Sequence, residues 1–125
     1  MSKKLFHMAH AIYHGKLPSM ELWVMLPSGL IFGKLLNREA MAKEIKKHVD
    51  PKSEIAPIEQ AVKSISYRFT YKDMDDADPD AAEEEIITLF HACLYGQDCI
   101  VDAPLVHVCA NKIIAWGPGP RPSLP

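Results

Sequence analysis

The sequence predicts an α+β fold: a small, strongly bent antiparallel β-barrel with an N-terminal helix and a helical insertion. Residues 20–36, MELWVMLPSGLIFGKLL, hold two apolar runs around a Pro-Ser-Gly turn, which indicates a β-hairpin. Residues 86–116 hold further β-rich runs separated by turn residues. Gly33 interrupts the hairpin's second run and permits the kind of sharp bend or bulge that closes small barrels.

The first run of the hairpin is apolar on both faces. In an extended strand Leu22, Val24 and Leu26 point to one side, whereas Trp23 and Met25 point to the other. Such a strand needs two covers. One is the protein's own core, and the other is the N-terminal segment, the insertion or another subunit.

The composition is that of one globular domain. Of the 125 residues, 48% are hydrophobic and 24% are charged, which suffices for a single core. We assign residues 1–116 to this domain, with residues 37–85 as the insertion. Residues 117–125, GPGPRPSLP, form a flexible Pro-rich tail.

Charge and cysteine content restrict the environment and the partners. The formal net charge of −2 gives no overall attraction to nucleic acid, so RNA binding needs a local basic patch. Three cysteines, an odd number, fit reduced thiols better than disulfides and predict a cytoplasmic protein. With no signal peptide and no apolar run long enough for a bilayer, we expect no membrane partner.

Residues 3–14 predict an amphipathic helix that lies across the barrel. Leu5, Ala9 and Ile12 form an apolar stripe at helical spacing. Gly15 stands where a left-handed residue would end the helix.

Three histidines lie on the other side of this helix. His7, His10 and His14 are spaced so that neighbouring imidazoles can converge on a metal ion. The alternative is a polar, solvated face, which we favour because no carboxylate or cysteine accompanies them.

The insertion begins with a basic helix over residues 38–49, capped by Asn37. Lys43, Lys46 and Lys47 form the densest basic cluster of the chain. They are candidate ligand-binding residues for phosphate, although charge on the outer face of a helix is usually solvated.

The rest of the insertion changes its pattern twice. Residues 57–63 suit a short helix, and residues 65–71 alternate aromatic or apolar with polar side chains, which predicts a strand. Its rings are either core or a stacking surface for bases, and we favour core. Residues 73–85 are strongly acidic and predict an exposed, mobile loop.

The second unit, residues 86–116, is predicted to form three strands. Residues 86–94 form a β-rich run, residues 95–98 a turn, and Pro104 the start of the next strand. Asn111 and Lys112 form a tight corner before the last strand, with Asn111 at positive φ. They are further candidate ligand-binding residues.

The two ends of the chain resemble an Sm-like (LSm-type) small β-barrel. Residues 22–35 look like the family's first signature, with Leu26 and Gly29 among its markers, and residues 106–116 resemble its last. The resemblance implies an oligomer assembled through strand edges and RNA as the ligand. Cys109-Ala110 stand where the family has Arg-Gly, so the family's RNA-binding residues are not carried over.

One His/Cys constellation is a candidate metal site. His91-x-Cys93 and His107-x-Cys109 place a His and a Cys on one face of each of two strands that the intervening turn makes neighbours. Two imidazoles and two thiolates suit zinc, whereas buried Cys and hydrogen-bonded His are the commoner roles of these residue types.

The function that we predict is a non-enzymatic, homo-oligomeric binding module without a cofactor. RNA is the ligand implied by the resemblance, and a protein partner or scaffold role is the alternative. A small thiol- or zinc-dependent enzyme, for example with Cys93 as nucleophile and His107 as base, is the hypothesis from another class.

Overall fold

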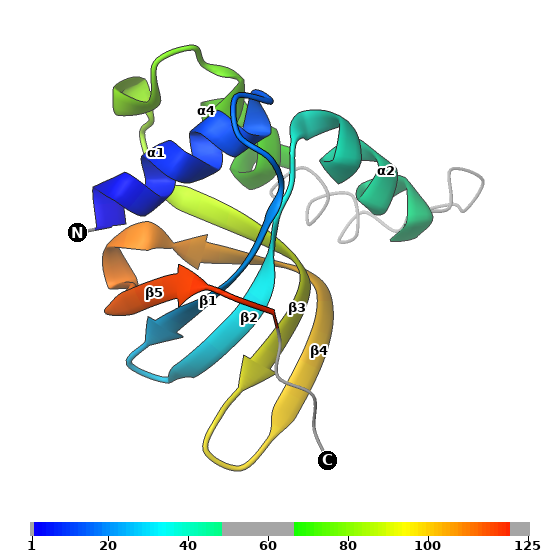
Figure 1. Cartoon of the computed structure of the whole chain (residues 1–125), viewed down its shortest axis with the longest axis vertical. Helices are drawn as coiled ribbons and strands as arrows, with labels where there is room; N and C mark the ends of the chain where they lie inside the picture. The colour runs from blue at the N-terminus through cyan, green and yellow to red at the C-terminus, as the bar shows by residue number, and fades with distance from the viewer. Residues whose placement is uncertain (1, 49–66, 121–125) are drawn as a thin grey trace.

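The computed structural model describes residues 2–48 and 67–120 (Figure 1). Helical elements cover one end of a curved sheet. They are α1 (Ser2–Tyr13), α2 (Arg38–His48), the π-helical turn η1 (Arg68–Lys72), α4 (Asp73–Asp75) and the 3-10 turns η2 (Pro79–Ala81) and η3 (Ala110–Lys112). The strands are β1 (Met20–Leu26), β2 (Gly29–Leu35), β3 (Ile86–Tyr95), β4 (Ile100–Cys109) and β5 (Ala115–Pro118). These elements confirm the α+β class.

The five strands form one antiparallel sheet in the order β4-β3-β2-β1-β5. β5 pairs with β1 from Leu22 opposite Pro118 to Met25 opposite Ala115. The apolar runs near the beginning and near the end of the chain therefore lie side by side as predicted. The closed barrel is not observed. Within the described residues no ladder joins β4 to β5, and both remain edge strands.

The β1–β2 hairpin and its bend follow the prediction. Leu26 pairs with Gly29 across the Pro-Ser turn. The β2–β3 register shifts between Phe32 and Lys34, because these residues pair with Cys93 and Phe90 and leave one extra residue on β3. Gly33 lies at this bulge, where a Cβ atom would come within 2.8 Å of the Leu89 Cβ.

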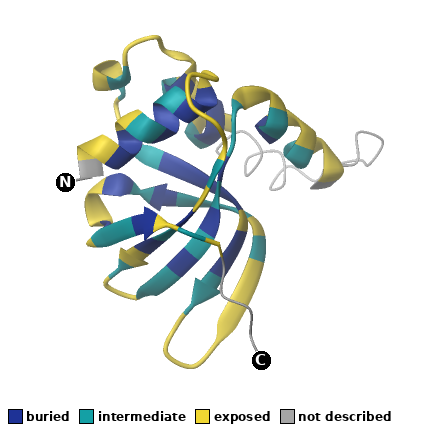
Figure 2. Cartoon of the chain, in the orientation of Figure 1, coloured by how far each residue is buried: buried dark blue, intermediate teal, exposed yellow. Residues whose placement is uncertain are grey.

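Helix α1 lies over the sheet and η3, and its apolar stripe is buried (Figures 1 and 2). Gly15 has φ +77° and ends the helix as predicted. Its N–H donates to Ile12 O, and the N–H of Lys16 donates to Ala11 O, so these two carbonyls of the last turn are satisfied.

The insertion agrees with the sequence at its start and departs from it later. The Ala40 N–H donates to Asn37 Oδ1 at 2.8 Å, which confirms the helix cap. The strand predicted for residues 65–71 is wrong where the structure describes it, because residues 67–72 are helical. Tyr67 and Tyr71 then lie one helical turn apart with ring centroids 5.1 Å from each other. The helix predicted for residues 57–63 lies outside the described residues.

Two predictions for the second unit are corrected. β4 begins at Ile100 and contains Pro104 in its middle, which an edge strand tolerates because its outer side needs no N–H donor. The corner at residues 110–112 is a 3-10 turn, and Asn111 does not have positive φ. His91, at the bulge, takes that conformation instead, with φ 51°.

Candidate functional site

The predicted ligand-binding residues lie on two separate elements. Lys43, Lys46 and Lys47 are exposed on α2, and Asn111 and Lys112 are exposed on η3. Two of the lysines pair within their own helix: Lys43 with Glu39 at 3.8 Å and Lys47 with Glu44 at 3.0 Å. Part of the basic cluster is thereby neutralised.

The predicted metal residues do not converge. β3 and β4 are antiparallel neighbours as expected, but Cys93 pairs with Asp102, and Cys109 pairs with Ile86 at the other end of the ladder. The bulge turns His91 outward, whereas Cys93 is buried. His107 instead shares a 2.9 Å hydrogen bond with Thr88 Oγ1, and burial lowers its pKa. In the described part of the chain, no three His, Cys, Asp or Glu side chains are placed to hold a metal ion.

A cleft of about 510 Å³ opens where α2 meets the bulged part of β3 and the edge strand β4. Its lining consists of small or ring-shaped side chains and of charged side chains, which are here called its charged wall. It is lined by Glu44, Lys47, His91, Ala92, Asp102, Ala103 and Pro104. Its volume lies in the range of small-ligand sites, and bulges often lie beside such sites.

Glu44 organises the charged wall of this cleft. Its Oε2 lies 3.2 Å from His91 Nε2, and its Oε1 lies 3.0 Å from Lys47 Nζ. The hydrogen bond from Lys47 lowers the pKa of the Glu44 carboxyl, and the His91 charge acts in the same direction against burial. The wall therefore holds an ionised carboxylate between two basic groups.

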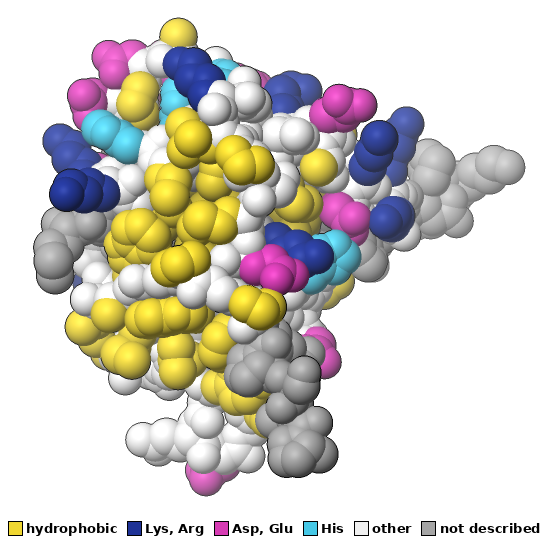
Figure 3. Space-filling model, viewed as in Figure 1, with side chains coloured by type: hydrophobic (Ala, Val, Ile, Leu, Met, Phe, Trp, Pro, Cys, Tyr) yellow, Lys and Arg dark blue, Asp and Glu magenta, His cyan; other side chains and the backbone are white. Residues whose placement is uncertain are grey.

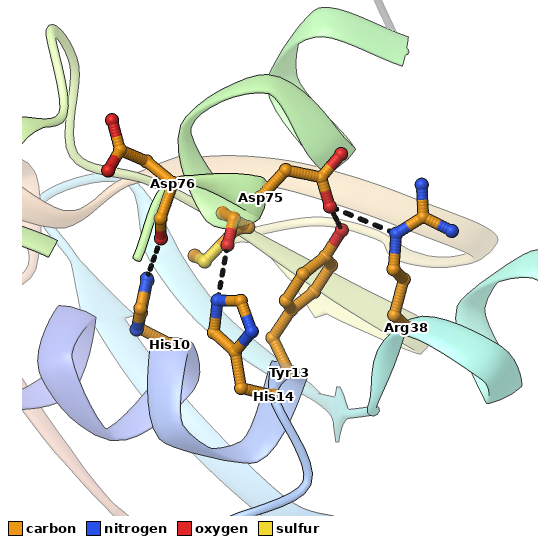
Figure 4. A network of polar contacts seen from close by, with 7 residues as sticks. His10, Tyr13, His14, Arg38, Asp75 and Asp76 are labelled. Atoms are coloured by element: carbon orange, nitrogen blue, oxygen red, sulfur yellow. Dashed lines mark hydrogen bonds and ion pairs between the residues drawn. The ribbon is translucent and has the colours of Figure 1, made fainter. Parts of the chain in front are cut away.

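A second polar network joins α1 to the acidic segment, residues 73–85 (Figure 4). His10 Nε2 lies 2.7 Å from Asp76 O, and His14 Nε2 lies 2.7 Å from Met74 O. His10 is only 4% exposed, so the solvated histidine face that we predicted is wrong at this position. These imidazoles satisfy backbone carbonyls and fix the acidic segment in place.

Asp75 connects three elements in the same network. Tyr13 donates its hydroxyl hydrogen to Asp75 Oδ1, and Arg38 Nε donates to the same oxygen at 2.9 Å (Figure 4). Burial opposes ionisation of Asp75, but the hydrogen bonds from Arg38 and Tyr13 outweigh it and lower the pKa of the carboxyl. Burial is the largest cause that raises the pKa of Tyr13, and the hydrogen bond to Asp75 is the second.

The acidic segment is thus ordered by contacts with the rest of the chain. Asp80 lies 3.0 Å from His7 Nε2, and the Asp76 and Asp78 carboxylates accept backbone N–H groups two residues on. Its carboxylates serve as local caps and ion-pair partners. Most of residues 73–85 are exposed as predicted, but the segment also contains the short helical elements α4 and η2.

Sequence reasoning missed Glu44, Tyr13 and Arg38 as members of these networks. The one-turn spacing of His10 and His14 was visible, but their partners lie 66 and 60 residues away, which no local pattern encodes.

Comparisons with other proteins add no assignment. No protein-family model matches the chain, and neither a curated protein nor a solved structure is significantly similar to it. None of the helices in the described ranges is long and apolar enough to cross a membrane.

Proposed function

We propose that this chain is a non-enzymatic binding module with Sm-like barrel topology that assembles with copies of itself through its strand edges. The observation that carries the proposal is the sheet order, in which β4 and β5 are the two edges of an unclosed, curved sheet. Unpaired edges are templates for pairing with another chain. Joining the β4 edge of one protomer to the β5 edge of the next removes both kinds of edge, and such head-to-tail contacts form a ring when the rotation closes.

Exposed apolar side chains near both edges support this assembly. Val101 in β4 is 48% exposed, and Ile114, directly before β5, is 52% exposed. Both would gain apolar neighbours on pairing, which adds a hydrophobic contribution to the ladder of hydrogen bonds.

The assembly is tested by the mass of the native protein in solution. We expect wild type to be an oligomer and Ile114→Lys to dissociate, because a charge at the β5 edge would be buried by the partner strand. Leu17→Lys is the matched control, since Leu17 is 45% exposed in the turn after α1. A wild-type monomer at micromolar concentration, or an Ile114→Lys protein that assembles as wild type does, would refute the proposal.

RNA is the proposed ligand because of the resemblance at the two ends of the chain, with Lys46 and Lys112 as exposed cations available for phosphate. Fluorescence anisotropy with a labelled single-stranded oligo(U) tests it at several salt concentrations. Binding that weakens with salt and with Lys46→Glu supports an RNA ligand. If no binding is seen at low salt, the RNA proposal is refuted, and the proposal of self-assembly is unaffected.

A protein ligand is the second candidate, favoured by the apolar area over β5, β1 and β2 in Figure 3. The Trp23 ring packs on Gly117, where a Cβ atom would lie 2.8 Å from the ring, and Met25 beside it is 38% exposed. Cross-linking mass spectrometry on protein isolated from cells would identify a partner on this area, and Trp23→Ser should reduce its capture.

A further inference from the structure

In the cleft beside α2, one carboxylate brings two basic side chains together. Glu44 divides its oxygens between them, with Oε1 3.0 Å from Lys47 Nζ and Oε2 3.2 Å from His91 Nε2. Lys47 belongs to α2 and His91 to β3, so the two basic groups come from different elements. The three side chains carry one net positive charge when His91 is protonated and none when it is neutral.

Both basic groups keep hydrogen-bonding capacity for a ligand. Glu44 occupies one of the three ammonium hydrogens of Lys47, whose side chain is 65% exposed. The side chain of His91 is 49% exposed, and within the described residues the contact with Glu44 is the only hydrogen bond or ion pair of its ring. Its Nδ1 is therefore left for a ligand, and this atom donates a hydrogen when the ring is protonated.

The backbone of His91 has an uncommon conformation at this site. Its φ of 51° lies in the left-handed region, and no other non-glycine residue of the described ranges has a positive φ. Such conformations cost free energy and cluster at binding and active sites. Here the bulge turns the imidazole outward to Glu44, while the next residue, Ala92, is buried. This placement favours a ligand-binding role for the imidazole.

The cleft has room for more than a small ion. Its volume of about 510 Å³ lies in the range of sites that hold small organic molecules. Ala92, Ala103 and Pro104 line it together with the charged side chains and leave space for the organic part of a ligand. Asp102 also lies in the lining, but it already has an interaction partner and is not counted as a free charge.

We propose that this cleft binds a phosphate ester, whose phosphate group accepts hydrogen bonds from Lys47 and from the protonated imidazole of His91. A phosphate suits these donors better than a carboxylate does, because its tetrahedral oxygens accept from several directions and a lysine ammonium is a common phosphate partner. The site requires neither the self-assembly nor the RNA ligand proposed above, since a free nucleotide and a nucleic acid chain both supply the group.

The class of ligand is tested by NMR on the full chain with labelled alanine methyl groups, which remain observable in a large oligomer. Uridine monophosphate, the dinucleotide UpU, uridine and acetate are added in separate titrations at pH 6 and constant ionic strength. The methyl signals of Ala92 and Ala103 should shift with the phosphate ligands and not with uridine or acetate. Ala110, which is buried in η3 and does not line the cleft, is the internal control.

Each outcome of these titrations decides a point. A shift with UpU extends the ligand to a nucleic acid chain, whereas a shift with uridine monophosphate alone restricts it to phosphate monoesters. If neither phosphate ligand shifts the two cleft signals, or if uridine or acetate shifts them equally, the proposal is wrong. A failure of oligo(U) binding together with a shift by uridine monophosphate would refute only the RNA ligand.

Two variants of α2 separate the cleft from the general charge of the helix. Lys47→Gln should weaken the binding of uridine monophosphate about fivefold or more, because it removes one of two cationic contacts. Lys43→Gln removes the same charge from an exposed side chain outside the cleft lining and should leave the affinity unchanged. Equal affinities of the two variants would overturn the site.

His91→Asn tests the imidazole, because asparagine tolerates positive φ and has no ionisable ring. At pH 6 it should bind uridine monophosphate about fivefold more weakly than wild type, and at pH 8 the two proteins should bind alike. The other charged groups of the lining, Glu44, Lys47 and Asp102, are the same in both proteins, as is the ligand at each pH. Equal affinity at pH 6 would overturn the contact with His91.

Discussion

Replacing Gly33 with alanine is expected to destabilise the fold through the bulge between β2 and β3. The new Cβ would lie 2.8 Å from the Leu89 Cβ and 3.4 Å from the Phe90 carbonyl oxygen. The Leu89 Cβ is fixed to its backbone, so the contact is relieved only when β3 itself moves. Overpacking of this kind costs about 1 to 3 kcal/mol.

The measurement is the free energy of unfolding in urea, and tryptophan fluorescence monitors the unfolding. Gly96→Ala is the matched control, because its Cβ would meet only Cys99 atoms at 3.7 Å and its backbone needs no positive φ. We expect the control to change stability by less than about 0.5 kcal/mol. A Gly33→Ala protein as stable as the control would refute the close packing of β2 against β3 at the bulge.

Three further predictions concern the polar networks. The lowered pKa of Asp75 gives stability that is present above about pH 3.9, the unfolded value, and is lost as the pH falls further; Asp75→Asn should flatten the stability profile there. Burial lowers the pKa of His107, so the unfolded chain binds the proton more readily and stability should fall as the pH drops below about 6.5, but not in His107→Phe. His10→Ala should speed amide hydrogen exchange in residues 74–80 about tenfold, while His7→Ala, at a half-exposed side chain, should have less effect.

The parts of the fold that the sequence predicts are those set by local stereochemistry. Gly15 ends α1 because only a residue tolerant of positive φ fits there, and Asn37 caps α2 through its own side chain. The Pro-Ser turn and the Gly33 bulge are likewise properties of a few neighbouring residues. Each of these features needs no knowledge of the rest of the chain.

The parts that could not be predicted depend on distant partners. The alternation in residues 67–71 is typical of a strand. In the structure Tyr71 is buried in the core, and the Arg38 guanidinium carbon lies 5.0 Å from its ring centroid. A helix also allows these contacts, so the pattern alone does not decide between the two structures. The bulge places His91 outward and Cys93 inward, so equal spacing along the sequence no longer means a common face. For this geometric reason the four candidate zinc ligands do not lie together.

The insertion shares one hydrophobic core with α1 and the sheet. One face packs under α1, and Tyr71 and Met74 of the insertion are buried in the same core as Phe90 and Ile87 of β3. The two edges have no comparable cover in the described chain, and β4 is exposed along its first half (Figure 2). In the assembly proposed above, copies of the same chain would cover the two edges that no described strand pairs with. The face that packs under α1 is satisfied within each protomer, and we expect the edges to be satisfied only in the assembly.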